Sequence, residues 1–89
     1  MTREEAAKVF GFDPESIGIR HRHWWINEEE YTNDFGMVVP AGALIVEARD
    51  GAANMIDAEA FRKPNYLDSW EDWSDPTYRY YVYTPLEQT

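Results

Sequence analysis

The sequence predicts an α+β fold, an antiparallel sheet of four or five strands with an N-terminal helix and a short helix before the last strand. Three observations favour this class. With 89 residues, the chain is expected to form a single domain, residues 1–89, around one small core. Hydrophobic residues make up 44% of it, too many for a disordered sequence. The stretch from Met37 to Gly51 is apolar and long enough to supply a central sheet element.

The N-terminal helix is predicted from its two ends. Thr2 and Glu5 form a capping box, in which the Thr hydroxyl and the Glu carboxylate each accept a backbone N–H of the first turn. Gly11 is suited to the left-handed residue that ends a helix, and Pro14 lies shortly beyond it. The helix is therefore expected to run from Thr2 to Phe10.

The next element is predicted to be a strand from Ile17 to Ile26, because residues two apart in a strand share a face. One face of this strand carries Ile17, Ile19, His21, His23 and Trp25, and the other carries Arg20, Arg22, Trp24 and Ile26. The segment Asn27 to Asp34 is acidic and lacks apolar periodicity. It is expected to be an exposed loop.

The central stretch is predicted to alternate between strands and turns. Pro40-Ala41-Gly42 is expected to turn the chain between a strand at Met37 to Val39 and a strand at Leu44 to Arg49. Asp50-Gly51 is a strong hairpin signal before a short strand at Ala52 to Ile56.

The C-terminal third is predicted to contain little helix and one clear strand. Asp57 can cap a short helix that ends by Lys63, and Asn65 to Pro76 is expected to hold one or two helical turns. Thr77 to Thr84 is rich in Tyr and is predicted to be the last strand, ended by Pro85.

The charge of the chain limits its partners. The formal net charge is −9, which disfavours direct binding of nucleic acid and favours a partner with a basic surface. The absence of Cys excludes disulfides and thiolate metal sites. The charged N-terminus and the short apolar runs predict neither a signal peptide nor a membrane span. We expect a cytoplasmic protein.

Two acidic segments are the candidate partner-binding sites. Aromatic side chains ringed by charge are typical of protein interfaces, since Trp and Tyr offer large contact areas at low entropic cost. Trp70 and Trp73 can alternatively belong to the core. The candidate partner-binding residues are Glu28, Glu29, Glu30, Asp34, Asp68, Trp70, Glu71, Asp72, Trp73 and Asp75.

Two alternatives remain open at the predicted first strand. His21 and His23 have the spacing to chelate one metal ion, with Glu28, Glu29 or Glu30 as a third ligand. The other alternative is a small-ligand pocket for an anion such as a nucleotide phosphate, formed by Arg20, Arg22, Trp24 and Trp25. No nucleophile or phosphate-loop motif is present, so we expect no catalytic residues, no enzyme activity and no cofactor.

One segment resembles a known group of proteins. Pro40 and Gly42, the apolar strand after them, Gly51, Ile56, Phe61 and Tyr66 resemble a segment of small uncharacterised phage and prophage proteins with a Pro-Gly-Asp-Tyr-type motif. The resemblance covers about a third of the chain, and Ala43-Leu44 departs from the motif. It implies a small β-rich domain of phage origin, and therefore a location in the host cytoplasm. Such acidic, Cys-free proteins include inhibitors of host defence, among them anti-CRISPR and anti-restriction proteins that mimic DNA.

Overall fold

The computed structural model describes residues 1–17, 20–49 and 60–88. Helix α1 (Arg3–Phe10) follows the N-cap Thr2, and the reciprocal hydrogen bonds with Glu5 complete the capping box. Gly11 ends the helix with φ +83°, and its N–H donates to the Ala7 carbonyl. The predicted helix is confirmed at both ends.

A short 3-10 helix, η1 (Pro14–Ser16), connects α1 to the sheet. The Asp13 carboxylate caps it by accepting from the Glu15 N–H, and it also pairs with the Arg3 guanidinium. Ile17 follows η1 and is buried against the helix side of the core. The prediction that the first strand begins at Ile17 is therefore wrong, because the capped turn occupies the residues just before Ile17.

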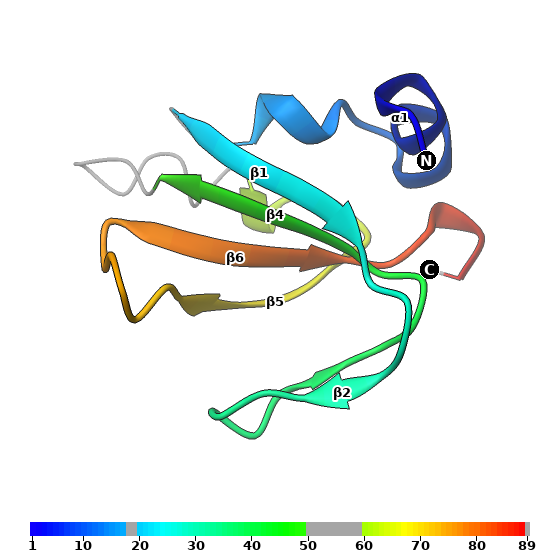
Figure 1. The fold of residues 1–89 in the computed structure, drawn as a ribbon. Coiled ribbons are helices and arrows are strands. Elements are labelled where there is room, and N and C mark those ends of the chain that lie inside the picture. Colours follow the sequence, from blue (N-terminus) through cyan, green and yellow to red (C-terminus); the bar gives the residue numbers. More distant parts are fainter. Residues whose placement is uncertain (18–19, 50–59, 89) are drawn as a thin grey trace.

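Four antiparallel strands form the main sheet, in the order β1-β4-β6-β5 (Figure 1). Their bounds are β1 (His21–Ile26), β4 (Leu44–Arg49), β5 (Tyr66–Glu71) and β6 (Tyr78–Tyr83). The apolar β4 and the Tyr-rich β6 lie at the centre, where strands need β-branched and aromatic residues on both faces. The α+β class is confirmed.

Two predicted elements are wrong. Residues 66–71, expected to be helical, form strand β5, whose Trp70 lies opposite Tyr80 of β6. The expected loop contains β2 (Tyr31–Thr32), which pairs with β3 (Val38–Val39) in a separate two-stranded sheet. The strand at Met37 to Val39 therefore pairs with β2, which precedes it in the sequence, and not with β4, which follows it.

Other predictions at the centre have different outcomes. The turn at Pro40 to Gly42 is confirmed, since Gly42 has φ +84° and the Ala43 N–H donates to the Pro40 carbonyl at 3.3 Å. The expected turn at Asp50-Gly51 and strand at Ala52 to Ile56 lie outside the described residues. Of the expected short helix, only Ala60 to Lys63 is described, and Ala60 and Phe61 are helical.

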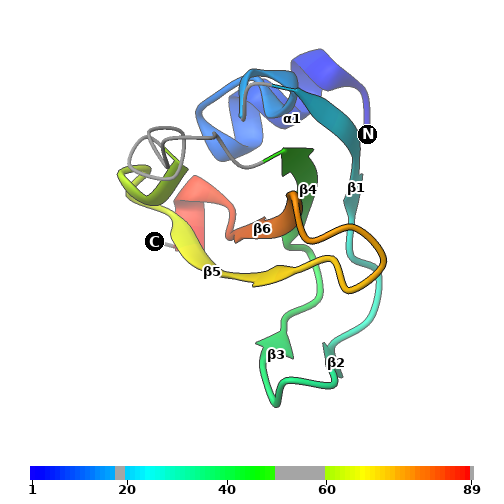
Figure 2. The same ribbon diagram turned by 90° about the vertical axis from the view of Figure 1, so that its left-hand side faces the viewer.

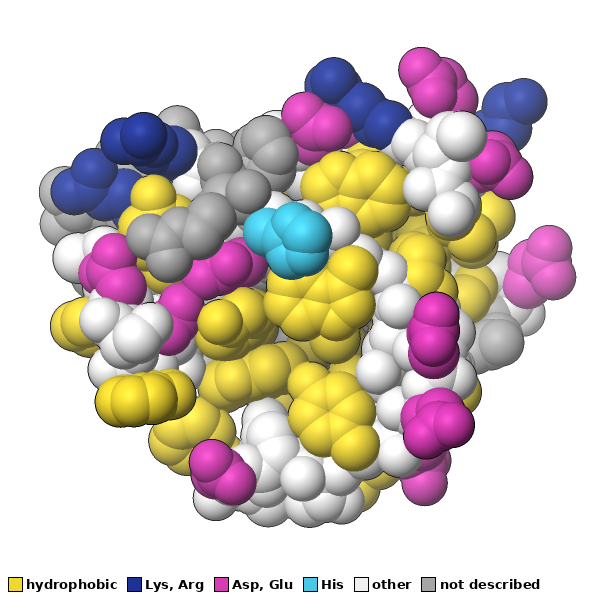
Figure 3. Space-filling view, in the orientation of Figure 1, with side chains coloured by type: hydrophobic (Ala, Val, Ile, Leu, Met, Phe, Trp, Pro, Cys, Tyr) yellow, Lys and Arg dark blue, Asp and Glu magenta, His cyan; other side chains and the backbone are white. Residues whose placement is uncertain are grey.

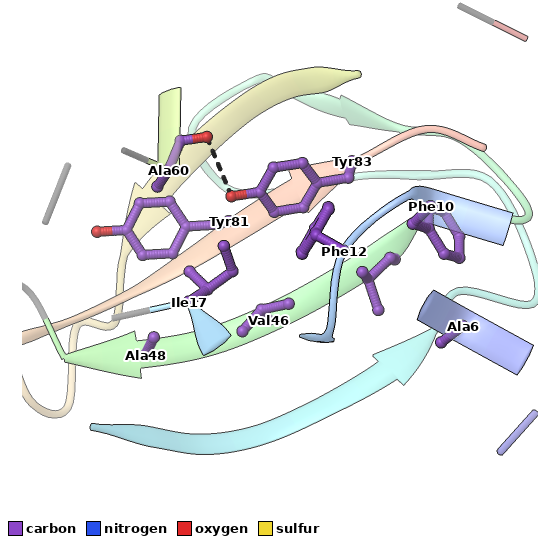
Figure 4. Close-up of a cluster of buried hydrophobic side chains, with 10 residues drawn as sticks. Ala6, Phe10, Phe12, Ile17, Val46, Ala48, Ala60, Tyr81 and Tyr83 are labelled. Carbon is purple, nitrogen blue, oxygen red and sulfur yellow. Dashed lines mark hydrogen bonds between the residues drawn. The ribbon is translucent and has the colours of Figure 1, made fainter. Parts of the chain in front are cut away.

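The main core lies between α1 and one face of the sheet (Figure 4). Its buried members are Ala6, Phe10, Phe12, Ile17, Leu44, Val46, Ala48, Ala60, Tyr81 and Tyr83. The Tyr83 hydroxyl donates to the Ala60 carbonyl at 3.2 Å, so its polar end is satisfied inside the core. Burial of these side chains provides most of the stabilisation of the fold.

The opposite face of the sheet carries the β2–β3 pair instead of a helix (Figure 2). A smaller core of Val39, Ala43, Ile45 and Val82 lies here. After β6, the 3-10 helix η2 (Leu86–Gln88) contacts α1, and Asn65 donates to the carbonyls of Phe10 and Thr84. Within the described part of the chain, no helix has the length and apolarity needed to cross a membrane.

Candidate interaction surface

A row of aromatic side chains crosses the helix-free face of the sheet. Cross-strand pairing places His23 opposite Glu47, Glu47 opposite Tyr80, and Tyr80 opposite Trp70, so one residue of each strand lies in line. Trp70 stacks on Tyr80 with ring centroids 5.0 Å apart. On β1, His23 stacks on Trp25 at 5.0 Å, and Trp25 meets the edge of Tyr80 at 5.9 Å. These contacts hold the aromatic rings in fixed positions on this face.

A buried carboxylate pair lies beside the row. Glu47 and Asp72 are 7% and 4% exposed, and their side chains are hydrogen-bonded to each other. Two carboxyl groups can share a hydrogen bond only when one of them carries a proton. Asp72 also accepts from the Ser74 hydroxyl at 2.7 Å and from the Tyr80 hydroxyl at 3.1 Å. The pair therefore locks the end of β5 and the turn after it onto β4 and β6.

The surroundings of this pair shift two pKa values. Hydrogen bonds from Ser74 above all, and then from Glu47, lower the pKa of Asp72 from 3.8 to about 2. Burial above all, with the hydrogen bond from the Tyr80 hydroxyl to Asp72, raises the pKa of Tyr80 from 10.0 to about 12. Asp72 is thus a carboxylate and Tyr80 a neutral phenol at neutral pH.

The β2–β3 hairpin exposes apolar side chains to solvent. The Asn33 side-chain oxygen accepts from the N–H groups of Phe35 and Met37, and Gly36 has φ +81°, which fixes the tip of the hairpin. Phe35 is 65% exposed and Val38 is 51% exposed. Tyr31 on β2 is 40% exposed. Tyr31 pairs with the buried Val39 and Val38 pairs with Thr32, so Tyr31 and Val38 lie on opposite faces of the hairpin. The exposed apolar patch is therefore spread over both faces of the hairpin and its tip.

Acidic side chains accompany this patch. Glu28, Glu29, Glu30 and Asp34 are all exposed, and no Lys or Arg occurs in the sequence between Arg22 and Arg49. In Figure 3, hydrophobic side chains occupy the middle of this face below the histidine, Asp and Glu lie along its margins, and Lys and Arg lie at its upper margin. We call Glu28, Glu29, Glu30, Tyr31, Asp34, Phe35 and Val38 the acidic hairpin surface.

Two adjoining hollows of about 600 and 570 Å³ lie where β1 leads into the hairpin. The first is lined by Met1, Trp24, Trp25, Ile26 and Glu28. The second is lined by the residues from Trp25 to Tyr31. Because they share Trp25, Ile26 and Glu28, the hollows form one groove that runs along the outer edge of β1 to the acidic residues.

The structure divides the second predicted acidic segment. Asp68, Glu71 and Trp73 are exposed, and Trp73 reaches 89%. Trp70 is half-buried in the aromatic row, and Asp72 is buried, so neither presents a free polar surface. Asp75 is partly buried and accepts from the Thr77 N–H and hydroxyl. This segment runs along β5 and past its end, which is level with the start of β1, whereas Glu28 to Glu30 follow the end of β1. The two segments therefore do not form one acidic cluster.

The residues of the two alternatives are also separated. Trp24 packs on the helix side of the sheet and Trp25 on the other side, so the two indoles do not face each other across a ligand. Arg20 is exposed, and the side chains of His21 and Arg22 lie outside the description. Among the side chains that the structure describes, no three His, Asp or Glu are grouped as a metal site.

Sequence reasoning missed several members of this face. Glu47 is a lone acid inside an apolar strand, and the two-residue period places it beside Ile45 on the face opposite α1, which signals a partnered carboxylate. Phe35 directly precedes Gly36 in the turn and Val38 begins β3 two residues later, and apolar residues in and beside a turn are a signal for an exposed patch. Tyr80 carried no signal of its own among the Tyr residues of β6.

The chain matches no protein-family model, no curated protein and no solved structure.

Proposed function

We propose that this chain is a non-catalytic binding protein whose acidic hairpin surface occupies a basic surface of a partner protein. The observation that carries the proposal is the exposure of Phe35, Val38 and Tyr31 among acidic side chains, in a stretch without Lys or Arg. Exposed apolar side chains with a charged rim are typical of protein interfaces. The acids steer a basic partner towards the patch, and the apolar groups slow its release.

The partner class follows from the charge. A protein of net charge −9 is repelled by nucleic acid, yet it competes well for the basic surfaces that bind nucleic acid. We therefore favour a nucleic-acid-handling complex of a host cell as the partner and inhibition as the outcome, in line with the resemblance to small phage proteins. The exposed residues of the second predicted segment lie apart from this surface, on and after β5, and are not part of the proposed contact.

Two matched triple variants test this function. E28Q/E29Q/E30Q neutralises the acidic hairpin surface, whereas E4Q/E71Q/E87Q neutralises three exposed acids elsewhere, and each changes the net charge from −9 to −6. Each tagged protein is incubated with host lysate at low salt, and retained proteins are identified by mass spectrometry. We expect a basic partner on the wild type and on the control, and at least a tenfold loss on E28Q/E29Q/E30Q. Equal retention by both variants, or no salt-sensitive partner, contradicts the proposal.

A further inference from the structure

We infer that the outer edge of β1 binds an extended, positively charged segment of the partner as an added β-strand. This inference rests on the proposed function and specifies how the partner is held. It starts from the hydrogen-bonding pattern of β1 and the groove beside it.

The pairing of β1 with β4 determines which backbone groups face outward. The Asn27 N–H donates to the Ala43 carbonyl at 2.8 Å. This bond lies one residue beyond the last pair of the ladder, Ile26 opposite Leu44. Hydrogen-bonded and non-hydrogen-bonded pairs alternate along an antiparallel ladder. Trp25 therefore bonds towards β4, whereas the N–H and C=O groups of Trp24 and Ile26 point away from the sheet.

Among the described residues, none pairs with these outward groups. No hydrogen bond joins the backbone of Trp24 or Ile26 to any of the described residues outside the ladder. Unpaired N–H and C=O groups at a sheet edge are a template for another strand. The irregular register between His21 and His23 disrupts the earlier part of the same edge, so the template is confined to the end of β1.

The groove supplies room and side-chain contacts for such a strand. It runs along Trp24, Trp25 and Ile26 and ends at the acidic residues Glu28 to Glu30. Alternate side chains of an added strand lie on alternate faces, so basic residues on one face reach the glutamates while apolar residues on the other contact Trp25 or Ile26. Arginine fits best, because its guanidinium both stacks on indole and pairs with carboxylates.

Charge distinguishes the two candidate occupants of the β1 edge, a second copy of this chain and a basic segment of a partner. A second copy of this chain would bring its own Glu28 to Glu30 and its net charge of −9 to the same groove. Like charges placed across paired strands are destabilising. A basic segment has the complementary charge, and the structure therefore favours a partner segment over self-pairing.

The test uses two peptides of identical charge. The first is a blocked peptide of alternating Arg and Val, and the second carries N-methyl groups on the amides of one face, which removes those N–H donors. Binding is measured by titration calorimetry, and NMR follows the amide signals of Trp24 and Ile26. We expect the N-methylated peptide to bind at least tenfold more weakly, and only the parent peptide to slow hydrogen exchange at Trp24 and Ile26.

The outcomes separate the inference from the proposed function. Equal binding of both peptides, reduced by E28Q/E29Q/E30Q and not by E4Q/E71Q/E87Q, overturns strand addition while charge-based binding remains. No binding of either peptide contradicts both. Dimerisation of the free chain with protection of Trp24 and Ile26 also overturns the inference, because the edge then belongs to a second copy.

Discussion

The two edges of the main sheet differ in how they are protected. At β5, the ladder turns the Ser69 N–H outward, and the Asp68 carboxylate accepts it at 2.8 Å. A register irregularity between Tyr66 and Asp68 disturbs the start of this edge, and Asp72 fastens its end. At β1, no side chain in the described part of the chain accepts the outward N–H groups of Trp24 and Ile26 in this way. Natural sheets usually block their edges against unwanted pairing, so an edge left open beside an exposed acidic surface is more consistent with a binding function.

The largest expected effect on the free energy of unfolding distinguishes Trp25, on the edge strand β1, from Trp73, which follows the edge strand β5. Trp25→Ala removes the contacts with His23 and Tyr80, and we expect it to lower the free energy of unfolding by about 2 to 3 kcal/mol. Trp73→Ala, at a side chain 89% exposed, should change it by less than about 0.5 kcal/mol. Urea unfolding measures both. Similar losses for the two variants would show that the aromatic row does not stabilise the sheet.

A smaller effect on the free energy of unfolding tests the hydrogen bonds of Asp72, which hold the end of β5. Asp72→Asn keeps the size of the side chain but weakens its hydrogen bonds with Ser74 and Tyr80, and should cost about 2 kcal/mol. Asp75→Asn is the matched control, at a more exposed turn, and should cost less than about 1 kcal/mol.

Asp72 also makes the free energy of unfolding depend on pH in the acid range. The folded pKa of Asp72 is lowered from 3.8 to about 2, so its stabilisation is complete above pH 3.8 and is lost as the pH falls through 2. After allowance for solvent screening, the loss is about 1 to 2 kcal/mol. Asp72→Asn lacks this contribution, so its unfolding curve should approach that of the wild type at low pH. A constant difference between the two proteins down to pH 2 would contradict this assignment.

The sequence was most informative where local signals act alone. The capping box of Thr2 and Glu5 and the C-terminal Gly11 define α1, and the apolar run of β4 was predicted at its observed bounds. β5 was missed because Trp70 and Trp73 have helical spacing and Asp68 and Ser69 disfavour strands. Pairing with β6 overrides those local preferences.

The surface was predicted in part for a similar reason. Glu28 to Glu30 and Asp34 stand out as charges in the sequence and are exposed as expected. Asp72 has the same residue type, yet it is buried by contacts with Tyr80 and Glu47 that come from other strands. The open edge of β1 depends on strand order, which no local pattern specifies.

The smallest expected effect on stability tests the protection of β5. Asp68→Ala removes the acceptor of the Ser69 N–H at an exposed position, so the free energy of unfolding should fall by less than about 1 kcal/mol. Its main consequence is a second open edge, carrying less negative charge than the groove at β1. Two such edges can pair between molecules, so Asp68→Ala should self-associate at high protein concentration, as measured by analytical ultracentrifugation. Glu71→Ala removes a nearby exposed charge without freeing that N–H and should stay monodisperse; if both variants behave alike, the Asp68 carboxylate protects the edge only through its charge.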